Sequence, residues 1–561
     1  MSINSIFNTA SSSIVAQRIA LEVTGENIAN VNTPGYSRQR ANLETAPVTT
    51  TNGFPLGNGV IAATVQRFYD ASLQKNLLFN NSLLSNNQTR QSSLQQIEPV
   101  FNELTSDGLG KAMQNFFDSW QGLSANPAGV PERQTVLARA QLLIDNFQQA
   151  NDSLRSIQTN ATRALDGITN DITDKARSIA SLNDQITQLE MGGGDSANEL
   201  RDQRDLLVLE LSKKAGISFT EEKDSSLTIT LSSGNLLVQG NKYATVYTAP
   251  SNLATSAPDP NTVVPNTKIF ITAIGNPPPV SNVAVNTDIT SLVGGPQNAQ
   301  GEIGAMLEIR DTTVPGYLAK LDELAYNLAD QVNIQHKQGW NLNNIVGGDF
   351  FSSTTNFNSI NGLDTTGLAV GDAVTGTGIP FGTTISRIDS STQITLTPPL
   401  TRLVTSGTGI FAFPSGSQLG SITPTSGYSS SIRLNLTTTN EIAAADANPL
   451  TGGTGNNRNA LAIAAISYTP VAFADGSTTS VTTSYNALVS QTGSDILANQ
   501  NATTQGESFV KQLTNLRESV SGVSLDEELT NLIKYQKAFQ GAAKLITTAT
   551  DMMDTVLGLV R

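Results

Sequence analysis

The sequence lacks cysteine and contains one histidine among its 561 residues. Without cysteine the chain forms no disulfide, zinc–thiolate site or cysteine nucleophile. The one histidine, His336, cannot supply a cluster of imidazole ligands, and no G-x-S-x-G or G-x-x-x-x-G-K-[ST] motif accompanies it. Because His336 falls near the end of a helical pattern, we expect a surface or helix-capping histidine rather than a general base. The sequence predicts no enzyme, no metal site and no cofactor.

The chain is also poor in charge and in apolar residues, at 14% and 38%, against about 25% and 45–50% in ordinary globular proteins. Its net charge of −14 argues against nucleic-acid binding, which needs a basic face. No run approaches the ~18 apolar residues of a membrane span. The first residues, MSINSIFNTASSS, lack a basic stretch followed by an apolar one, so we expect no signal-peptide cleavage.

In the first thirty residues, mostly apolar side chains recur at alternating spacings of four and three residues. This pattern is typical of a helix that packs against another helix, and these positions form the N-terminal seam. Pro34 and Gly35 then end the helix. Gln17 and Thr24 fall within this seam and favour a weakly stable coiled coil over a deep core. The apolar residues of the N-terminal seam are Ile3, Phe7, Ile14, Leu21 and Ile28.

The C-terminal segment repeats the same spacing. Ser524 and Glu527 form a predicted capping box. Asp526, Glu527 and Glu528 fall in the first helical turn, where the helix dipole favours negative charge; metal binding by this acidic trio is the less favoured alternative. The residues of the C-terminal seam are Leu525, Leu529, Leu532, Phe539, Ile546, Met553 and Leu557.

Between the two ends, the apolar spacing predicts one long helix from Val136 to Leu189. A Gly-Gly-Gly-Asp stretch at 192–195 is interpreted as the break that follows this helix. Further helices are predicted at 69–105, 108–124, 197–213, 302–337, 457–467 and 484–519.

Two regions change to the alternating pattern of strands, 216–300 and 346–440. The first includes predicted strands at 227–231, 236–238 and 243–247, and the second a compact β-module with Gly-rich turns. The predicted fold class is therefore α+β multidomain, with a long α-helical coiled-coil-like stem formed by both chain ends and with inserted β-rich domains. The predicted domains are 1–44 with 520–561 (terminal heptad helices), 45–215 with 301–345 and 441–519 (helical stem), 216–300 (inserted β domain), and 346–440 (second β-rich domain with a variable module at about 358–415).

Four segments resemble a known family. Residues 27–38, NIANVNTPGYSR, closely resemble the N-terminal signature of bacterial flagellar rod and hook axial proteins, and 521–559 resembles their C-terminal signature. Within that superfamily, NELRDQRDLL at 198–207 and GYLAKLDELAYNLADQVNIQH at 316–336 are similar to the flagellar hook-associated protein 1 family. The resemblance covers most of the helical sequence but not 358–415.

The resemblance implies a structural component of the bacterial flagellum, which polymerises as an adaptor at the hook–filament junction and allows filament assembly. The two terminal helices would line the inner tube wall. The implied partners are the hook protein, the second junction protein (hook-associated protein 3), further copies of the chain in a ring or helical layer, and a flagellar export chaperone that binds the C-terminal seam. The implied location is the extracellular flagellum, reached by type III export without signal-peptide cleavage.

The resemblance also gives a role to the Asn-rich turn after the first helix. Side chains of Asn30, Asn32 and Thr33 can bond to the backbone and fix the turn. Spacing alone equally allows a generic helix end, whereas the resemblance favours an assembly motif. Its residues are Asn27, Asn30, Asn32, Thr33, Pro34, Gly35 and Tyr36.

Three alternatives stay open at this point. The chain could be the hook or distal-rod protein, although the predicted helices at 131–190 and 302–337 count against it. It could be an adhesin that binds ligands through 358–415 and uses its helices as a stalk. A peptidoglycan hydrolase is the third alternative, for which the inserted segments offer no convincing pair of catalytic acids.

Overall fold

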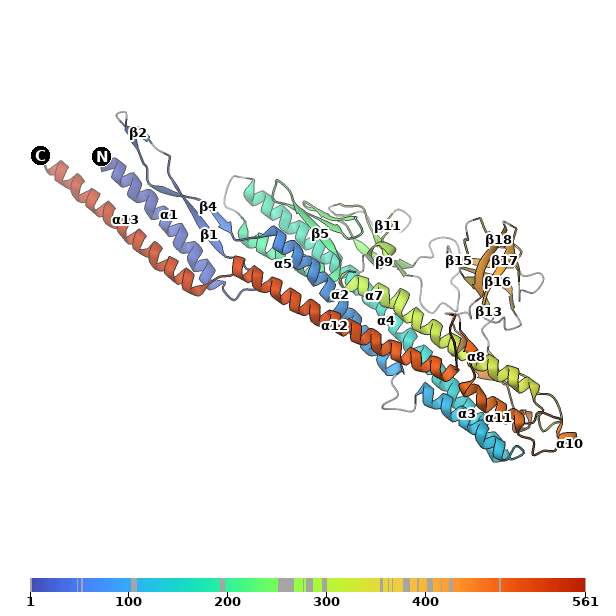
Figure 1. Cartoon of the computed structure of the whole chain (residues 1–561). Coiled ribbons are helices and arrows are strands. Elements are labelled where there is room, and N and C mark those ends of the chain that lie inside the picture. Colours follow the sequence, from blue (N-terminus) through green and yellow to red (C-terminus); the bar gives the residue numbers. More distant parts are fainter. Residues whose placement is uncertain are drawn as a thin grey trace. The chain divides into compact units, whose positions relative to one another are not determined.

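The structure, a computed structural model, divides the chain into two compact units (Figure 1). The first unit comprises 1–90, 162–308 and 500–561, and the second comprises 91–161 and 309–499. The residues that the structure describes are 3–47, 49–51, 54–101, 108–191, 197–250, 267–275, 277–278, 286–294, 300–353, 357–361, 363–365, 367–376, 384–390, 393–400, 407–414, 416–422, 427–473 and 476–559.

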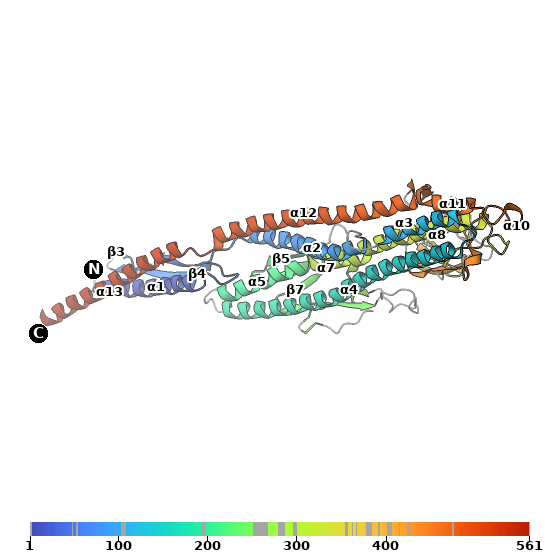
Figure 2. The same cartoon turned by 90° about the horizontal axis from the view of Figure 1, so that it is seen from below.

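In the first unit, the two ends of the chain form a helix pair. Helix α1 (Ile3–Ala29) and helix α13 (Leu525–Leu559) lie side by side in both views, with the two chain termini at the same end of the pair (Figures 1 and 2). Proline and glycine follow α1 at once, so the helix ends where the sequence predicts.

A long β-hairpin packs against α1, whereas the sequence predicts only helices at the chain ends. Strand β1 (Gln39–Thr45) pairs antiparallel with β4 (Val60–Arg67), and β2 (Thr49–Thr51) pairs with β3 (Phe54–Leu56). The register shifts between Asn42 and Leu43. Such a bulge re-aims side chains and breaks the alternation by which a strand is recognised in sequence.

The main core of the first unit lies between long helices and small antiparallel sheets. The C-terminal part of α4 (Val130–Glu190) and α5 (Asn198–Lys214) bury apolar residues with strands β5 (Ile217–Glu221), β6 (Leu227–Leu231), β7 (Leu236–Gln239) and β8 (Lys242–Tyr243). Strands β9 (Val246–Pro250), β10 (Thr267–Ile271) and β11 (Thr287–Asp288) form a second sheet, followed by α6 (Thr290–Gly294) and α7 (Gly301–Glu308). In β6 the side chains of Leu227, Ile229 and Leu231 are buried and the threonines between them are not, as the period of two predicts.

The second unit contains helices, short strands and one larger sheet. Its helices are α3 (Leu109–Ala125), the N-terminal part of α4, α8 (Val314–Gln338), α9 (Tyr428–Ser431), α10 (Pro449–Gly452), α11 (Arg458–Ala465) and part of α12 (Val481–Ser521), while α2 (Ala71–Phe101) and α12 supply residues to both units. Its short strands include β20 (Val471–Ala472) and β21 (Thr478–Thr479), which pair with each other.

The helix predicted at 302–337 is divided in the structure. A π-helical turn, Ile309–Thr313, separates α7 from α8, and Pro315 occupies the first turn of α8. Proline has no N–H to donate, and this loss costs least in the first turn of a helix, where the N–H groups have no partner within the helix. The Gly-rich break predicted at 192–195 lies outside the described residues, between the last residue of α4 and the first of α5.

The β-module in the second unit is a six-stranded antiparallel sheet with its own apolar core. The strand order is β14 (Thr375–Gly376), β17 (Gly407–Phe413), β18 (Gly416–Ile422), β13 (Phe357–Asn361), β16 (Gln393–Leu400) and β15 (Thr384–Ser390). Buried residues of this core include Ile360, Val374, Ile385, Ile394 and Leu396.

The chain enters and leaves the module at one place. Strand β12 (Phe351–Ser353) pairs antiparallel with β19 (Ile432–Leu434), which places the entering and leaving segments side by side. The buried Asp322 of α8 accepts hydrogen bonds from the backbone N–H groups of Gly427, at 2.7 Å, and Ser429, at 2.9 Å. The module thus begins and ends on a hydrogen-bonded base.

The predicted α+β class is confirmed. The prediction of a surface or capping position for His336 is wrong, because the imidazole is 0% exposed. Its Nε2 accepts a hydrogen bond from the N–H of Ala443, at 2.9 Å, and its Nδ1 lies 2.7 Å from the carbonyl oxygen of Gly348. Because Nε2 accepts from a backbone N–H, it carries no proton of its own. The ring proton is therefore on Nδ1, which donates to Gly348, and the imidazole is neutral. Rings of Trp120 and Phe350 meet it edge-on.

Burial lowers the pKa of His336 to about 4, below the ~6.5 of an unfolded chain. As pH falls, His336 therefore takes up a proton in the unfolded state before it does so in the folded state. The contribution of His336 to the free energy of unfolding is complete above about pH 6.5 and is lost as pH falls toward 4. We expect the second unit to lose about 3 kcal/mol across this range. The chain's single imidazole NMR signal should not titrate between pH 8 and about pH 5, and His336→Gln should remove this part of the pH dependence. A signal that titrates near the unfolded pKa would contradict the buried, neutral ring.

The closed base predicts that the module can be removed. Replacement of residues 354–426 by a short Gly-Ser join retains β12, β19 and the Asp322 contacts with Gly427 and Ser429. We expect the helices to remain folded, with unchanged helical circular dichroism after correction for length and an unchanged His336 signal. Loss of helical signal would show that the module's core stabilises the helices.

Candidate functional site

Asn27, in the last turn of α1, lies at the centre of a buried hydrogen-bond network and is 1% exposed. Its Nδ2 donates to the carbonyl oxygen of Gln39, at 2.8 Å, and to Oε2 of Glu528, at 3.1 Å. Its Oδ1 accepts from the N–H of Gln39 and from the hydroxyl of Tyr36, both at 2.9 Å. All four hydrogen-bonding positions of the amide are used. One side chain thereby joins α1, the following turn, β1 and α13.

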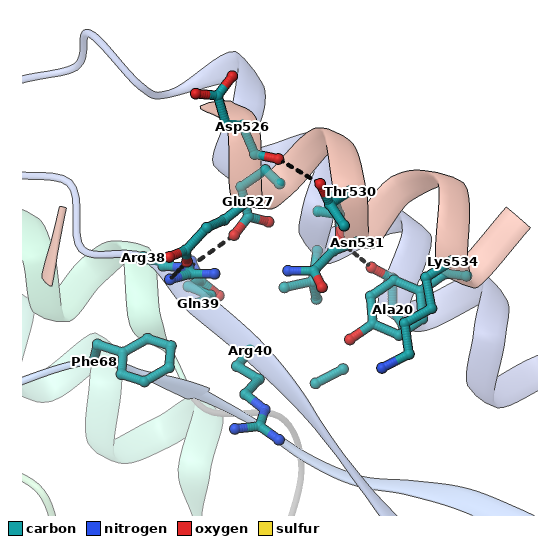
Figure 3. A pocket seen from close by; sticks show the side chains of 15 residues that line it. Ala20, Arg38, Gln39, Arg40, Phe68, Asp526, Glu527, Thr530, Asn531 and Lys534 are labelled. Carbon is teal, nitrogen blue, oxygen red and sulfur yellow. Dashed lines mark hydrogen bonds and ion pairs between the residues drawn. The ribbon is translucent and has the colours of Figure 1, made fainter. Parts of the chain in front are cut away.

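Glu528 and Arg38 form the charged part of this network. Glu528 is 2% exposed, and its Oε1 accepts from Nε of Arg38 at 2.7 Å. Nη1 of Arg38 also binds Glu527 at 2.6 Å, and the Glu527 carboxylate is 61% exposed (Figure 3). Backbone adds a further bond, from the N–H of Arg38 to the carbonyl oxygen of Ser521 at 2.8 Å.

The acidic trio does occupy the first turn of α13, as the sequence predicts. Its carboxylates do more than cap a helix, however, because Glu527 and Glu528 bind a residue almost 500 positions earlier. No local pattern of sequence signals this ion pair. Among the residues that the structure describes, no group of three or more acidic or histidine side chains is arranged to hold a metal ion.

Side-chain bonds contribute to the turn after α1, and the predicted side-chain-to-backbone bond is present for Asn30. Nδ2 of Asn30 donates to the carbonyl oxygen of Glu26 at 3.1 Å. The hydroxyl of Thr33 donates to Oδ1 of Asn30 at 3.0 Å, and the N–H of Thr33 donates to the carbonyl oxygen of Asn30 at 2.9 Å. These bonds satisfy groups that the end of a helix leaves unpaired.

Gly35 adopts a positive φ of 83°, which glycine accepts without steric cost. A Cβ at this position would lie 3.5 Å from Leu206 of α5, and the carbonyl oxygen of Gly35 accepts from Arg517 at 3.3 Å. Asn32 and Pro34 are exposed. The expected bond from the Asn32 side chain is absent from the described part of the chain.

Helix α5 anchors the chain just after the turn. The N–H of Ser37 donates to Asp202 at 2.8 Å, and Nη1 of Arg67 binds Asp202 at 2.9 Å and Asp205 at 2.6 Å. Burial raises the pKa of Asp205, an effect that Arg67 opposes. The two acids belong to the NELRDQRDLL segment, so this segment positions the base of the terminal helices.

A second contact from the same segment reaches the hairpin. Nδ2 of Asn198 donates to Oε1 of Gln39 at 3.0 Å and to the carbonyl oxygen of Val65 at 3.1 Å. Burial raises the pKa of Tyr36, and the carboxylates of Glu26 and Asp202 raise it further. The Tyr36 hydroxyl therefore stays protonated and serves as a hydrogen-bond donor to Asn27.

The seam residues predicted from large apolar side chains are not the most buried ones in the terminal helices. Small and polar residues are buried, including Gln17 and Thr24, which the sequence places within the N-terminal seam; the others are Ala10, Ala16 and Ala20 in α1, and Ala542 and Ala549 in α13. Most of the predicted residues are only half-buried, namely Phe7, Ile14, Leu21, Ile28, Leu532, Phe539 and Ile546. The side chain of Ile3 lies outside the described residues. Buried alanines such as Ala10 and Ala549 allow the two helix backbones to approach closely.

Large apolar side chains on α13 remain exposed. The exposed members of the predicted seam are Leu525, Leu529, Met553 and Leu557, and the structure adds Ile533, Leu545, Met552 and Val556. Such a concentration of exposed apolar surface marks an interaction site. In the described part of the chain, no helix has an apolar stretch long enough to cross a membrane.

Three models of protein families match the chain. Residues 94–351 match the flagellar hook-associated protein FlgK helical domain, 517–559 match the flagellar basal body rod FlgEFG protein C-terminal region, and 7–36 match the flagella basal body rod protein. The two rod-protein matches coincide with α13 and α1. The network around Asn27 therefore joins the two matched ends.

Relatives align along nearly the whole chain. Flagellar hook-associated protein 1 of Escherichia coli is 28% identical over 571 residues, covering 99% of this chain and 100% of its own. The protein of the same name from Bacillus subtilis is 26% identical, covering 98% and 97%. The solved structure of the flagellar hook junction protein FlgK from Burkholderia pseudomallei has a TM-score of 0.57 and 19% identity, over 80% of this chain and 100% of that one. This likeness shows a shared fold.

The network predicts unequal roles for two adjacent carboxylates. Glu528→Ala removes the buried carboxylate that binds Arg38 and one of the two bonds donated by the Asn27 amide, which should destabilise the base of α1 and α13 by about 2–3 kcal/mol. Glu527→Ala removes an exposed carboxylate from the same arginine and should cost less than about 1 kcal/mol. Amide hydrogen exchange of α1, residues 10–27, in the full chain measures both. Equal effects of the two substitutions would contradict the proposed importance of the buried pair.

Proposed function

Because this chain belongs to the flagellar hook-associated protein 1 family, we propose that it polymerises as a structural adaptor at the hook–filament junction and allows the filament to assemble. The observation that carries this proposal is the full-length alignment with relatives of that name. The family is a structural family of the flagellum, and the chain is accordingly a flagellar component.

The arrangement of the terminal helices supports polymerisation. Within one chain α1 and α13 bury small side chains, whereas α13 leaves Leu529, Leu545 and Leu557 about half exposed or more. An apolar surface that a single chain does not cover gains stability when a neighbouring subunit covers it. The chain ends would then contribute to the inner wall of a tube, with the rest of each subunit outside.

The proposed neighbours are other axial proteins. The hook protein would lie on one side, hook-associated protein 3 on the other, and further copies of this chain in the same ring or helical layer. We propose export to the extracellular flagellum by the flagellar type III pathway, without signal-peptide cleavage.

The export chaperone is proposed to bind α13 before assembly. An amphipathic helix laid into a groove is recognised through apolar residues on one or two faces. The exposed residues of α13, including Leu529 and Leu557, offer such anchors. Chaperone and neighbouring subunits would therefore compete for one surface, which keeps subunits apart until they reach the growing tip.

Two alternatives have specific tests. The full-length match to hook-associated proteins disfavours a hook or distal-rod protein. An adhesin function would require the module at 357–422 to bind a ligand in isolation from the flagellum, and a hydrolase would digest peptidoglycan in zymography.

The adaptor proposal predicts the phenotype of a gene deletion. The deletion strain should keep intact hooks, lack filaments and secrete monomeric flagellin, and the wild-type chain should restore filaments. Leu529→Asp should not restore them, because a carboxylate on a surface that becomes buried costs several kcal/mol. Thr548→Asp, at another exposed position of α13, is the matched control and should restore filaments. Immunoblots of isolated flagella and of the medium separate failed incorporation from failed export. Normal filaments in the deletion strain would refute the adaptor function.

A further inference from the structure

A cleft of about 590 Å³ opens at the base of the terminal helices, within the first unit. Helix α1, strand β1 and helix α13 line it (Figure 3). Its apolar lining includes Val23, Ala41, Phe68 and Tyr535. The Arg38 ion pairs described above form one end of the cleft, where the carboxylates of Asp526, Glu527 and Glu528 outnumber the single guanidinium.

The other end of the cleft carries two cations whose charge is not balanced. Arg40 extends from β1 and Lys534 from α13 toward the same open side (Figure 3). Both side chains are exposed. In the part of the chain that the structure describes, neither takes part in an ion pair or a side-chain hydrogen bond. In a chain with a net charge of −14, such a pair of cations attracts an acidic segment.

The last turns of α13 are such a segment. Residues 550–558 are helical, and each of them is exposed in the part of the chain that the structure describes. Asp551 and Asp554 lie three residues apart, a spacing that places both carboxylates on one face of the helix. Neither carboxylate has an ion pair among the described residues. Leu557, at 61% exposed, lies three residues after Asp554 and therefore on the same side of the helix.

We propose that this tail of α13 docks into the cleft of a second copy of the chain. Asp551 and Asp554 would face Arg40 and Lys534, and Leu557 would cover part of the apolar lining. The tail cannot reach the cleft of its own chain, because 20 residues of continuous helix hold Asp554 about 30 Å along the axis from Lys534. A contact between two different surfaces of identical chains is head-to-tail and builds a ring or an open helix.

The inference rests on the proposed self-assembly and specifies its contact. It accounts for two features at once: the cations on β1 and α13, which have no ion-pair partner among the described residues, and the exposed last turns of α13. Opposite charges also fix the register of the contact, since a shift by one helical turn would separate the two pairs.

The absence of cysteine permits a direct test by cross-linking in isolated flagella. A chain carrying both Lys534→Cys and Asp554→Cys should form a ladder of disulfide-linked multimers, since each copy would link to two neighbours. Each single variant should give no species larger than a dimer. A disulfide needs Cα atoms within about 7 Å, so the ladder requires the proposed contact. Cys at Lys511 with Cys at Asp554 is the control, because Lys511 lies on α12 outside the cleft.

A charge-swap series tests the electrostatic part of the contact. Arg40→Glu with Lys534→Glu should lower incorporation into flagella roughly tenfold, and so should Asp551→Lys with Asp554→Lys. Combining all four substitutions should restore incorporation. Lys511→Glu with Lys544→Glu, which alters exposed cations away from the cleft, should have no effect. Rescue by the variant with all four substitutions distinguishes the contact from damage to export. If the substitutions damaged export, their effects would add, and the variant with four substitutions would be incorporated less than either double variant.

The outcomes separate the two proposals. A ladder together with charge-swap rescue supports the docking. Wild-type amounts of the double-cysteine chain in flagella without a ladder would overturn the docking and leave the adaptor function standing, and so would absence of rescue with normal secretion. Absence of the wild-type chain from flagella would refute both.

Discussion

One buried amide couples the two ends of the chain. Asn27 bonds to the turn, the hairpin and Glu528, which lies 501 residues further along the sequence. Removal of this amide leaves the Tyr36 hydroxyl, the Gln39 backbone and a buried carboxylate short of partners, and each orphaned group costs about 1–3 kcal/mol. The direction of β1, the turn at Gly35 and the start of α13 all depend on this network. The NELRDQRDLL segment, which is the first part of α5, then binds the network through Asp202 and Asn198.

The terminal helices divide their side chains between two tasks. Alanines are buried within the chain, which brings the helices close but removes little apolar area from water. Larger residues, such as Leu529 and Ile533, lie on surfaces that one chain leaves open. Under the proposed assembly, neighbouring subunits would cover this apolar area. The helix pair would then gain much of its stability from assembly, since isolated helices are marginal in water.

Local patterns predict much of the fold, and long-range contacts account for what they miss. Apolar periodicity predicts α2, α4, α5, α12 and α13 to within a few residues, because long helices average over many positions. Alternation likewise predicts β6. The hairpin β1–β4 escapes because its bulge interrupts the alternation, and the pairing of Arg38 with Glu528 escapes because nothing near either residue signals it. His336 was misplaced for the same reason: its partners Gly348 and Ala443 approach from distant segments. The Asn-rich turn was found through its resemblance to a family, and the structure supplies the chemistry of Asn27 and Tyr36.

The ladder between β12 and β19 has a consequence for how such chains diverge. Paired antiparallel strands hold the two ends of the intervening sequence at a fixed separation of about 5 Å, whatever that sequence does. Lengthening a segment whose ends are already pinned adds little to its closure entropy, about 0.6 kcal/mol for each doubling. Changes in the residues between β12 and β19 therefore leave the positions of the helices unchanged, so the two parts can evolve separately. Related chains can exchange, enlarge or lose the segment between β12 and β19, while the surfaces proposed to contact neighbouring subunits stay under constraint.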